Sequence, residues 1–278
     1  MPIMALSDAG LTRLSFRIGV GRTVKDPTTT IPVLLYHRIA SSPDDRYAVS
    51  PAAFAEHVQA ILASNRTALT ISQLADVLAG SGGCHQGYVA VTFDDGYAET
   101  LDAVRSLKAL GLSATVYVTT GWIGAQGMLT SDQLKALADM RDVLELGAHT
   151  VSHPHLDELQ RREIEAEIVN SRDALREFDV PVRTFAYPHG AYDSSVRAAV
   201  IRAGFGSAAA VKNALSHQHD DRWAVARYTV SRATSLEQVS RLLQGHGAPL
   251  AWEEERWRTR AYRLARRFSR RVRAGAKA

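Results

Sequence analysis

The sequence has few features that would place the protein outside the cell or across a membrane. Its 278 residues include a single cysteine, Cys84, so the chain cannot form an internal disulfide, which favours a reducing compartment. No apolar run is long enough to cross a bilayer. Arg13, Arg17 and Arg22 interrupt the apolar residues near the N-terminus, so no signal-peptide core is recognisable and we expect a cytoplasmic protein.

Acidic residues are scarce at the C-terminal end. The segment 251–278 contains ten Lys or Arg and three Glu, which gives it a net charge of +7. Because the whole chain carries +4, residues 1–250 carry −3. Trp257, Leu264 and Phe268 share one face at helical spacing, which is typical of a helix on an anionic membrane surface. We therefore expect this tail to hold the protein at the inner face of the membrane. A helix packed on the rest of the protein is the alternative, and a nucleic-acid partner is not expected.

Short apolar strands alternate with helices along most of the chain. The pattern predicts strands at 31–36, 88–91, 114–118, 143–148, 182–187, 206–211 and 225–230, and helices at 51–62, 71–78, 101–110, 131–140, 155–178, 193–203 and 235–243. This alternation indicates a parallel sheet. Because the chain lacks a Gly-x-Gly-x-x-Gly turn, seven such units favour a closed or nearly closed barrel over an open dinucleotide-binding sheet.

Two adjacent carboxylates follow the strand predicted at 88–91. Residues 91–97 read VTFDDGY, so Asp94 and Asp95 come where a buried strand ends, and Gly96 permits a sharp turn. Neighbouring side chains on extended backbone point in opposite directions, so one carboxylate can bind a metal while the other handles a proton. The alternative interpretation is an ordinary Asp-Gly turn in which Asp94 caps the following helix.

A pair of histidines, His149 and His153, follows the strand predicted at 143–148. Their i, i+4 spacing would place both imidazoles on one side of a helical turn, close enough to share a cation. A chain with ten histidines produces such pairs by chance, so the position carries the argument. In a parallel barrel the carboxyl ends of all strands open on one face, which would gather both histidines, both aspartates and His37. Two histidines and one carboxylate are the ligand set of a hydrolytic metal site.

Three motifs in this order resemble the polysaccharide deacetylases, carbohydrate esterase family 4. They are TFDDGY, HTVSH and FAYPHG, supported by PVLLYHRI and SHPHLDEL, and the resemblance covers residues 31–230. It implies an α/β fold, a distorted (β/α)7-type barrel, which we place as a single catalytic domain at 31–250 between an irregular leader, 1–30, and the basic tail, 251–278. It also implies one Zn²⁺ or other divalent first-row transition metal held by Asp95, His149 and His153, with Asp94 as general base.

The FAYPHG motif supplies further candidate site residues by the same resemblance. In the family a backbone amide of this motif stabilises the oxyanion, which here would be the amide of His189 after Pro188, and Tyr187 is a further candidate for the oxyanion or substrate site. The His189 side chain replaces the usual Tyr, so its imidazole is a candidate further metal ligand or substrate contact, the alternative being no functional role. Trp122, in the loop 121–130, is a candidate for stacking on a sugar ring or, equally, a packed loop anchor.

The chain departs from the family pattern at two places. Ala186 stands where the family has the Arg that orients the base, so we expect Arg227 to take that role, the alternative being a surface arginine. The usual C-terminal strand ending in the acid histidine is missing. A closed barrel places its first and last strands side by side, so His37 is our candidate general acid, the alternative being a histidine that only hydrogen-bonds a loop.

These residues predict a metal-dependent hydrolase that removes N-acetyl groups from an amino-sugar polysaccharide or a lipid-linked glycan precursor. Two other interpretations stay open at this point. One is an amidohydrolase of the same fold acting on a small linear or cyclic amide, and the other is an inactive relic that binds carbohydrate without cleaving it.

Overall fold

The computed structural model describes residues 30–42, 44–80 and 87–251. The leader predicted before Thr30 and the basic helix predicted after Ala251 lie outside this range. No helix within the described range is long and apolar enough to cross a membrane.

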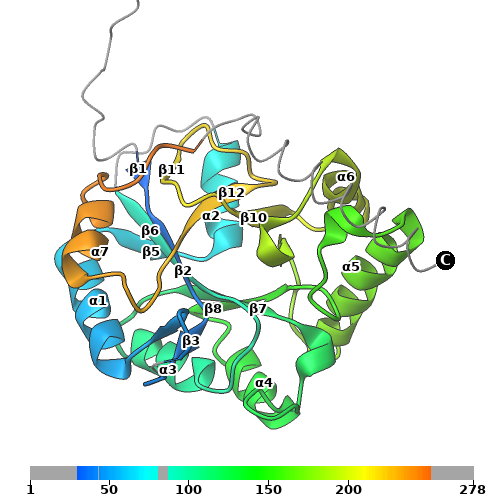
Figure 1. Ribbon diagram of the computed structural model, residues 1–278, viewed down its shortest axis with the longest axis horizontal. Helices are drawn as coiled ribbons and strands as arrows, with labels where there is room; N and C mark the ends of the chain where they lie inside the picture. The colour runs from blue at the N-terminus through cyan, green and yellow to red at the C-terminus, as the bar shows by residue number, and fades with distance from the viewer. Residues whose placement is uncertain (1–29, 43, 81–86, 252–278) are drawn as a thin grey trace, which may run out of the picture.

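Seven parallel strands close into a barrel, as predicted (Figure 1). Each pairs with the next around the ring, and β2 pairs with both β12 and β6, which closes it. The ring consists of β2 (Val33–Tyr36), β6 (Tyr88–Phe93), β7 (Ala114–Val118), β8 (Leu144–Ala148), β9 (Thr184–Ala186), β10 (Ser207–Val211) and β12 (Val225–Thr229). Every predicted strand therefore takes its place in the ring, and the first and last strands are neighbours.

Several short strands lie beside this ring, and the sequence patterns did not predict them. They are β5 (Thr67–Leu69), parallel to the start of β6; β1 (Thr30–Ile31), antiparallel to β11 (Ser216–His217); and β3 (Arg38–Ile39), parallel to β4 (Ala48–Val49). Each is two or three residues long, too short for a period of two to be recognised.

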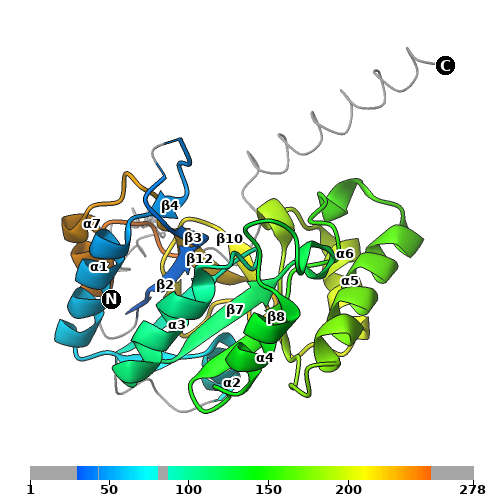
Figure 2. The same ribbon diagram turned by 90° about the horizontal axis from the view of Figure 1, so that it is seen from below.

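The helices surround the barrel on its outer side, except α2, which lies at one end of the barrel (Figure 2). They are α1 (Pro51–Ala63), α2 (Ile71–Ala79), α3 (Thr100–Ala109), α4 (Ser131–Ala138), α5 (Arg161–Arg176), α6 (Ser194–Arg202) and α7 (Leu236–Leu243). The predicted start of the long helix at residue 155 was wrong. Helix α5 begins at Arg161 because Leu159 and Gln160 are extended and Gln160 forms a capping box with Glu163.

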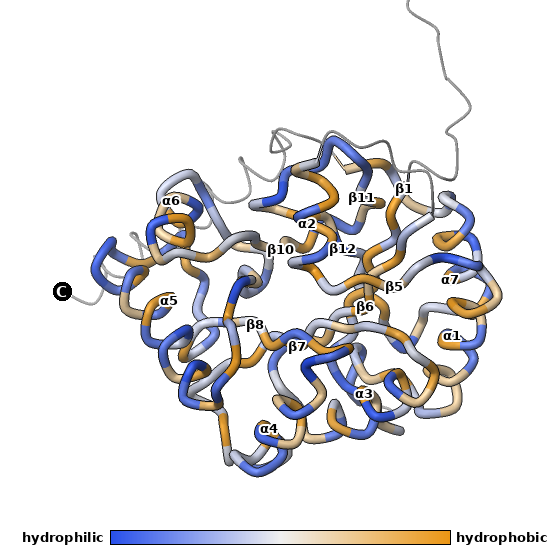
Figure 3. Tube along the Cα trace, turned by 180° about the vertical axis from the view of Figure 1, so that it is seen from behind, coloured by the Kyte–Doolittle hydropathy of each residue, from blue (hydrophilic) through white to orange (hydrophobic). Residues whose placement is uncertain are grey.

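Hydrophobic side chains form one core outside the barrel and a second within it. Outward-facing strand residues pack against the helices, and Figure 3 shows the apolar strands at the centre with mixed helices around them. Inside, Ile71 and Leu74 of α2 pack on Val33, Ala90 and Ala209. Helix α2 thus fills one end of the barrel, while the polar residues that follow the strands gather at the other.

Candidate metal centre and active site

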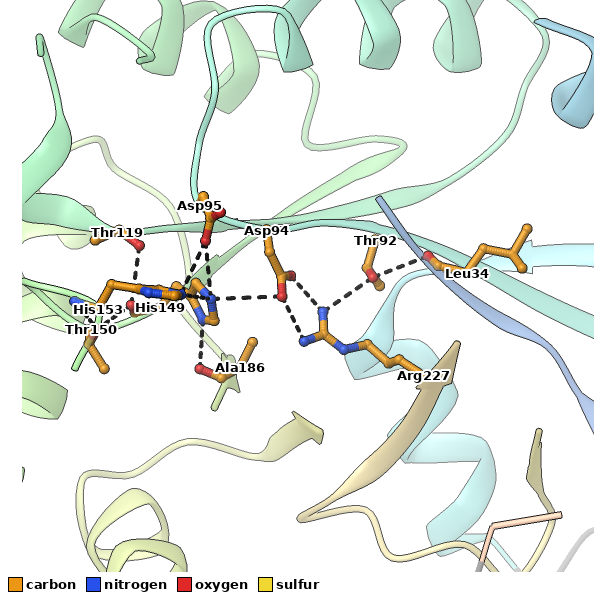
Figure 4. Close-up of polar contacts among 10 residues, drawn as sticks. All are labelled: Leu34, Thr92, Asp94, Asp95, Thr119, His149, Thr150, His153, Ala186 and Arg227. Carbon is orange, nitrogen blue, oxygen red and sulfur yellow. Dashed lines mark hydrogen bonds and ion pairs between the residues drawn. The ribbon is translucent and has the colours of Figure 1, made fainter. Parts of the chain in front are cut away.

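The three predicted metal ligands converge at the carboxyl ends of β6 and β8 (Figure 4). Oδ1 of Asp95 lies 3.5 Å from Nε2 of His149 and 3.3 Å from Nε2 of His153. The two Nε2 atoms are 3.2 Å apart. His149 is buried and His153 partly so, so the cluster lies at the boundary between core and solvent.

A loop, not a helical turn, brings the histidines together, so the helical interpretation of their spacing was wrong. Residues 149–153 turn through left-handed backbone at Thr150, with φ 69°, and at His153, with φ 59°. Asp95 is left-handed too, with φ 74°. Such conformations cost roughly 1–3 kcal/mol at each non-glycine residue, and they persist where surrounding contacts enforce them. Here the amide of His153 donates to Oγ1 of Thr150 at 3.0 Å.

The donor atoms fit a divalent cation. Nδ1 of His149 lies 2.8 Å from the carbonyl oxygen of Ala186, which can only accept, so Nδ1 carries the proton and Nε2 keeps its lone pair. Burial lowers the pKa of His149 to about 4, so this imidazole is neutral at neutral pH. Oδ1 of Asp95 is buried without a hydrogen-bond partner among the described residues. Two imidazoles and a carboxylate with an open side are a Zn²⁺-type ligand set.

Asp94 is held by Arg227, whose side chain crosses the barrel interior from β12. Nη1 lies 2.6 Å from Oδ1 and Nη2 lies 2.8 Å from Oδ2, a bidentate pair. Arg227 is 0% exposed, so the surface-arginine interpretation was wrong. Burial acts to raise the pKa of Asp94, but the charge and hydrogen bonds of Arg227, together with the neighbouring His149 and His37, outweigh it and the pKa is lowered. The helix-cap alternative for Asp94 was wrong as well, because Glu99 occupies the N-cap of α3.

His37 lies beside Asp94 because β2 and β6 end together. The amide of Asp94 donates to the carbonyl of Tyr36 at 2.9 Å, and His37 interacts electrostatically with both aspartates. Its Nδ1 is buried and finds no hydrogen-bond partner in the described part of the chain. The ring packs against that of Tyr47, with centroids 4.7 Å apart and the planes tilted by 31°. Among the described residues, no hydrogen bond from His37 to a loop supports the alternative interpretation.

The remaining candidates divide between the site and the core. The Trp122 ring lies 5.3 Å from that of His153, and the His189 ring 4.4 Å from the same imidazole. His189 is outside the set of converging ligand atoms, and burial and the neighbouring His153 lower its pKa to about 4. The Tyr187 side chain is fully buried and its hydroxyl donates to the carbonyl of Trp223 at 2.9 Å, so it belongs to the core.

Two contributors were missed at the sequence level. The carbonyl of Ala186 sets the tautomer of His149, and any residue type could supply it, so no sequence signal exists. Tyr47, in the loop between β3 and β4, packs against the His37 ring. The only sequence signal for this contact was that Tyr47 is an aromatic residue in an otherwise polar stretch.

Comparison with known proteins agrees with these observations. The family model described as polysaccharide deacetylase matches residues 82–208. The chain is 26% identical over 207 residues to the putative polysaccharide deacetylase YxkH of Bacillus subtilis (strain 168), covering 74% of this chain and 73% of that protein. The resemblance to this family predicted from the motifs is therefore confirmed.

Solved structures agree in fold. The Streptococcus pyogenes deacetylase PplD in complex with acetate is 24% identical, with a TM-score of 0.68 over 76% of this chain and 96% of that one. IcaB from Ammonifex degensii is 23% identical, with a TM-score of 0.67 over 78% of this chain and 97% of that one. At these identities the likeness establishes the barrel.

Proposed function

We propose that this relative of the polysaccharide deacetylases is a metal-dependent hydrolase that removes N-acetyl groups from an amino-sugar polysaccharide or a lipid-linked glycan precursor. The observation that carries the proposal is the convergence of Asp95, His149 and His153 beside the ionised Asp94. Zn²⁺ or another divalent first-row ion held by these three residues would polarise the acetyl carbonyl and lower the pKa of water.

Asp94 is the general base in this proposal. Its carboxylate accepts a proton from the attacking water, and Arg227 keeps both oxygens oriented and the group ionised. Oδ2 of Asp94 lies 3.7 Å from Nε2 of His149, so the base stands next to the metal ligands without being one of them. The expectation that the two carboxylates point in opposite directions was wrong, because Asp95 is left-handed and not extended, and its Oδ1 lies 3.5 Å from the same Nε2 of His149. The two roles are separated instead by their partners, since Arg227 binds both oxygens of Asp94 and leaves Oδ1 of Asp95 to the metal.

Two groups complete the proposed chemistry. The backbone amide of His189 stabilises the oxyanion, and its left-handed φ of 57° sets the direction of the turn. His37 gives a proton to the departing amine, because the pairing of β2 with β6 brings its imidazole beside Asp94 at the rim. Trp122 is half-buried and offers a face beside His153 on which a sugar ring can stack.

Acetate release from an N-acetylglucosamine oligomer, measured together with metal content, tests this function. The proposal expects one equivalent of metal and acetate production. Metal without acetate from the oligomer, but with turnover of a small amide, would favour the amidohydrolase. Sugar binding without any hydrolysis would favour the relic. The matched control is Asp94→Asn, which should keep the metal and lose acetate release.

For the partner and location of the protein, we propose that the basic segment 251–278 binds anionic lipid, which would bring the enzyme to lipid-linked substrate at the inner face of the membrane. Only the charge and the apolar spacing of this segment support the proposal, since residues 252–278 lie outside the described range.

A further inference from the structure

Glu167 of α5 accepts three hydrogen bonds from the loop that joins the two histidines. Oε2 accepts the amides of Val151 at 2.8 Å and of Ser152 at 2.9 Å. Oε1 accepts the hydroxyl of Ser152 at 2.6 Å. We propose that Glu167 is a positioning residue for the metal centre, which fixes His153 relative to His149 through the backbone between them. This inference rests on the metal centre proposed above.

The loop needs such an acceptor because its backbone cannot pair regularly. Left-handed residues at Thr150 and His153 flank Val151 and Ser152, so the two intervening amides point away from any strand or helix partner. A single carboxylate oxygen accepts both. A carboxylate suits this position because each oxygen has two lone pairs and its charge strengthens the bonds.

The opposite side of the loop is fixed by a second segment. The amide of Thr120 donates to the carbonyl of Thr150 at 3.1 Å, and the amide of Gly121 donates to that of Val151 at 2.8 Å. A Cβ at Gly121 would lie 2.5 Å from the Val151 oxygen, so only glycine allows this approach. The loop is therefore clamped between donors at 120–121 and the acceptor Glu167.

Glu167 acts through the backbone and not on the ligands directly. All of its hydrogen bonds within the described residues go to Val151 and Ser152. Its helix is held rigidly against the barrel, because Ile164 and Ile168 on the same helix are 4% and 0% exposed. A rigid helix can hold the left-handed turn in the conformation that brings His153 within 3.2 Å of His149.

The test is the Zn²⁺ affinity of the full-length protein, measured by competition with a chelator of known affinity. Glu167→Ala should weaken Zn²⁺ binding by about 10- to 100-fold, the range for losing a group that orients a metal ligand. Glu167→Gln should stay within a few-fold of the original, because its amide oxygen can accept both backbone amides and its NH₂ can donate to the Ser152 hydroxyl. The matched control is Glu165→Ala on the same helix, which removes only surface ion pairs with Arg161 and Arg202.

A purely structural role would give a different pattern. It would lower the melting temperature of the metal-free Glu167→Ala protein and leave the affinity of the folded protein unchanged, and that result overturns the proposal. The absorption spectrum of the Co²⁺-loaded protein should also change in Glu167→Ala and not in Glu165→Ala. Should Glu167→Ala fail to fold, Ser152→Ala removes one of the three bonds, and an unaltered affinity there counts against the proposal. Failure of the unsubstituted protein to bind Zn²⁺ would instead reject the metal centre itself.

Discussion

Arg227 and Asp94 form a bidentate ion pair across the interior of the barrel, with nitrogen–oxygen distances of 2.6 Å and 2.8 Å. The arginine comes from β12 and the aspartate from the end of β6, and β2 lies between these strands. The guanidinium also lies 5.2 Å from the centre of the Tyr117 ring. We propose that Arg227, from the far side of the first strand, thereby orients the base, a role for which the motif resemblance implies an arginine at the position of Ala186.

Removing the charge of Arg227 should shift the pH dependence of activity. In Arg227→Met, burial of Asp94 is no longer offset, so its pKa should rise and the acidic limb of the kcat/KM profile should move to higher pH. A stability loss of about 3–5 kcal/mol is also expected for a buried charge left alone. Arg227→Lys keeps a charge without the bidentate fork, and we expect its acidic limb to lie between the other two. Identical limbs in all three proteins would contradict the orienting role.

Replacing a metal ligand should abolish metal and activity together. His153→Ala leaves one imidazole and one carboxylate, too few for stable binding, so both the metal content and acetate release should be lost. Elemental analysis of the purified protein is the measurement. His155→Ala is the matched control, because it removes a neighbouring imidazole that is outside the ligand set. Retention of a full equivalent of metal by His153→Ala would show that the ligands are assigned wrongly.

His37→Ala should separate turnover from metal binding. The variant should fold and keep its metal, while kcat falls on the order of 10²–10⁴, the range for losing a positioned acid. Steady-state acetate release and metal analysis on the same sample check both expectations. Near-normal turnover would instead point to His189 or to water as the proton donor.

The basic tail should control binding to anionic lipid. Full-length protein should co-sediment with vesicles that contain anionic lipid, and a 1–250 variant should bind less, because it lacks the local charge of +7. Raising the salt concentration should weaken binding of the full-length protein. Equal binding by both proteins would reject a lipid-binding role for the segment.

The sequence was sufficient to place a candidate site residue where that residue directly follows an apolar strand. Each predicted strand is buried, so a polar residue directly after it lies at the barrel rim, and this placed Asp94, Asp95, His149 and His37 correctly. The closed ring followed from counting such runs. The neighbouring positions of β2 and β12 then followed from closure.

Other parts of the site could not be read from residue types. The left-handed turn at Thr150 looks like any polar stretch, and the i, i+4 spacing suggested a helix instead. The burial of Arg227 could not be predicted either, because an arginine on a short strand is usually exposed unless a buried carboxylate pairs with it. Tyr187 was assigned to the site, but it directly follows Ala186, the last residue of β9, with extended backbone. Side-chain alternation therefore places Ala186 inside the barrel and the Tyr187 ring in the outer core.

Glu145 provides a pH-dependent test of the barrel interior, remote from the rim. It lies on β8, and its Oε2 accepts from the amide of Ser72 at 3.0 Å and from the hydroxyl of Thr115 at 3.2 Å. The Ser72 hydroxyl donates to its other oxygen. Ser72 is in the first turn of α2, so this carboxyl group joins the helix that fills the barrel to the wall. Burial raises the pKa of Glu145 above its ordinary value despite these bonds.

A raised pKa means that the folded protein retains a proton that the unfolded chain releases near pH 4.5. The stabilisation from this group is therefore fully present below that pH and is lost as the pH rises through the folded pKa. Glu145→Gln cannot titrate, and its amide can still accept from Ser72 and donate to a hydroxyl. Its melting temperature relative to the original protein should therefore increase between pH 4 and pH 8. All other groups titrate in both proteins, so their contributions cancel in the difference. A difference in melting temperature that stays constant from pH 4 to pH 8 would show that the pKa of Glu145 is not raised and that the group is ionised in the folded barrel.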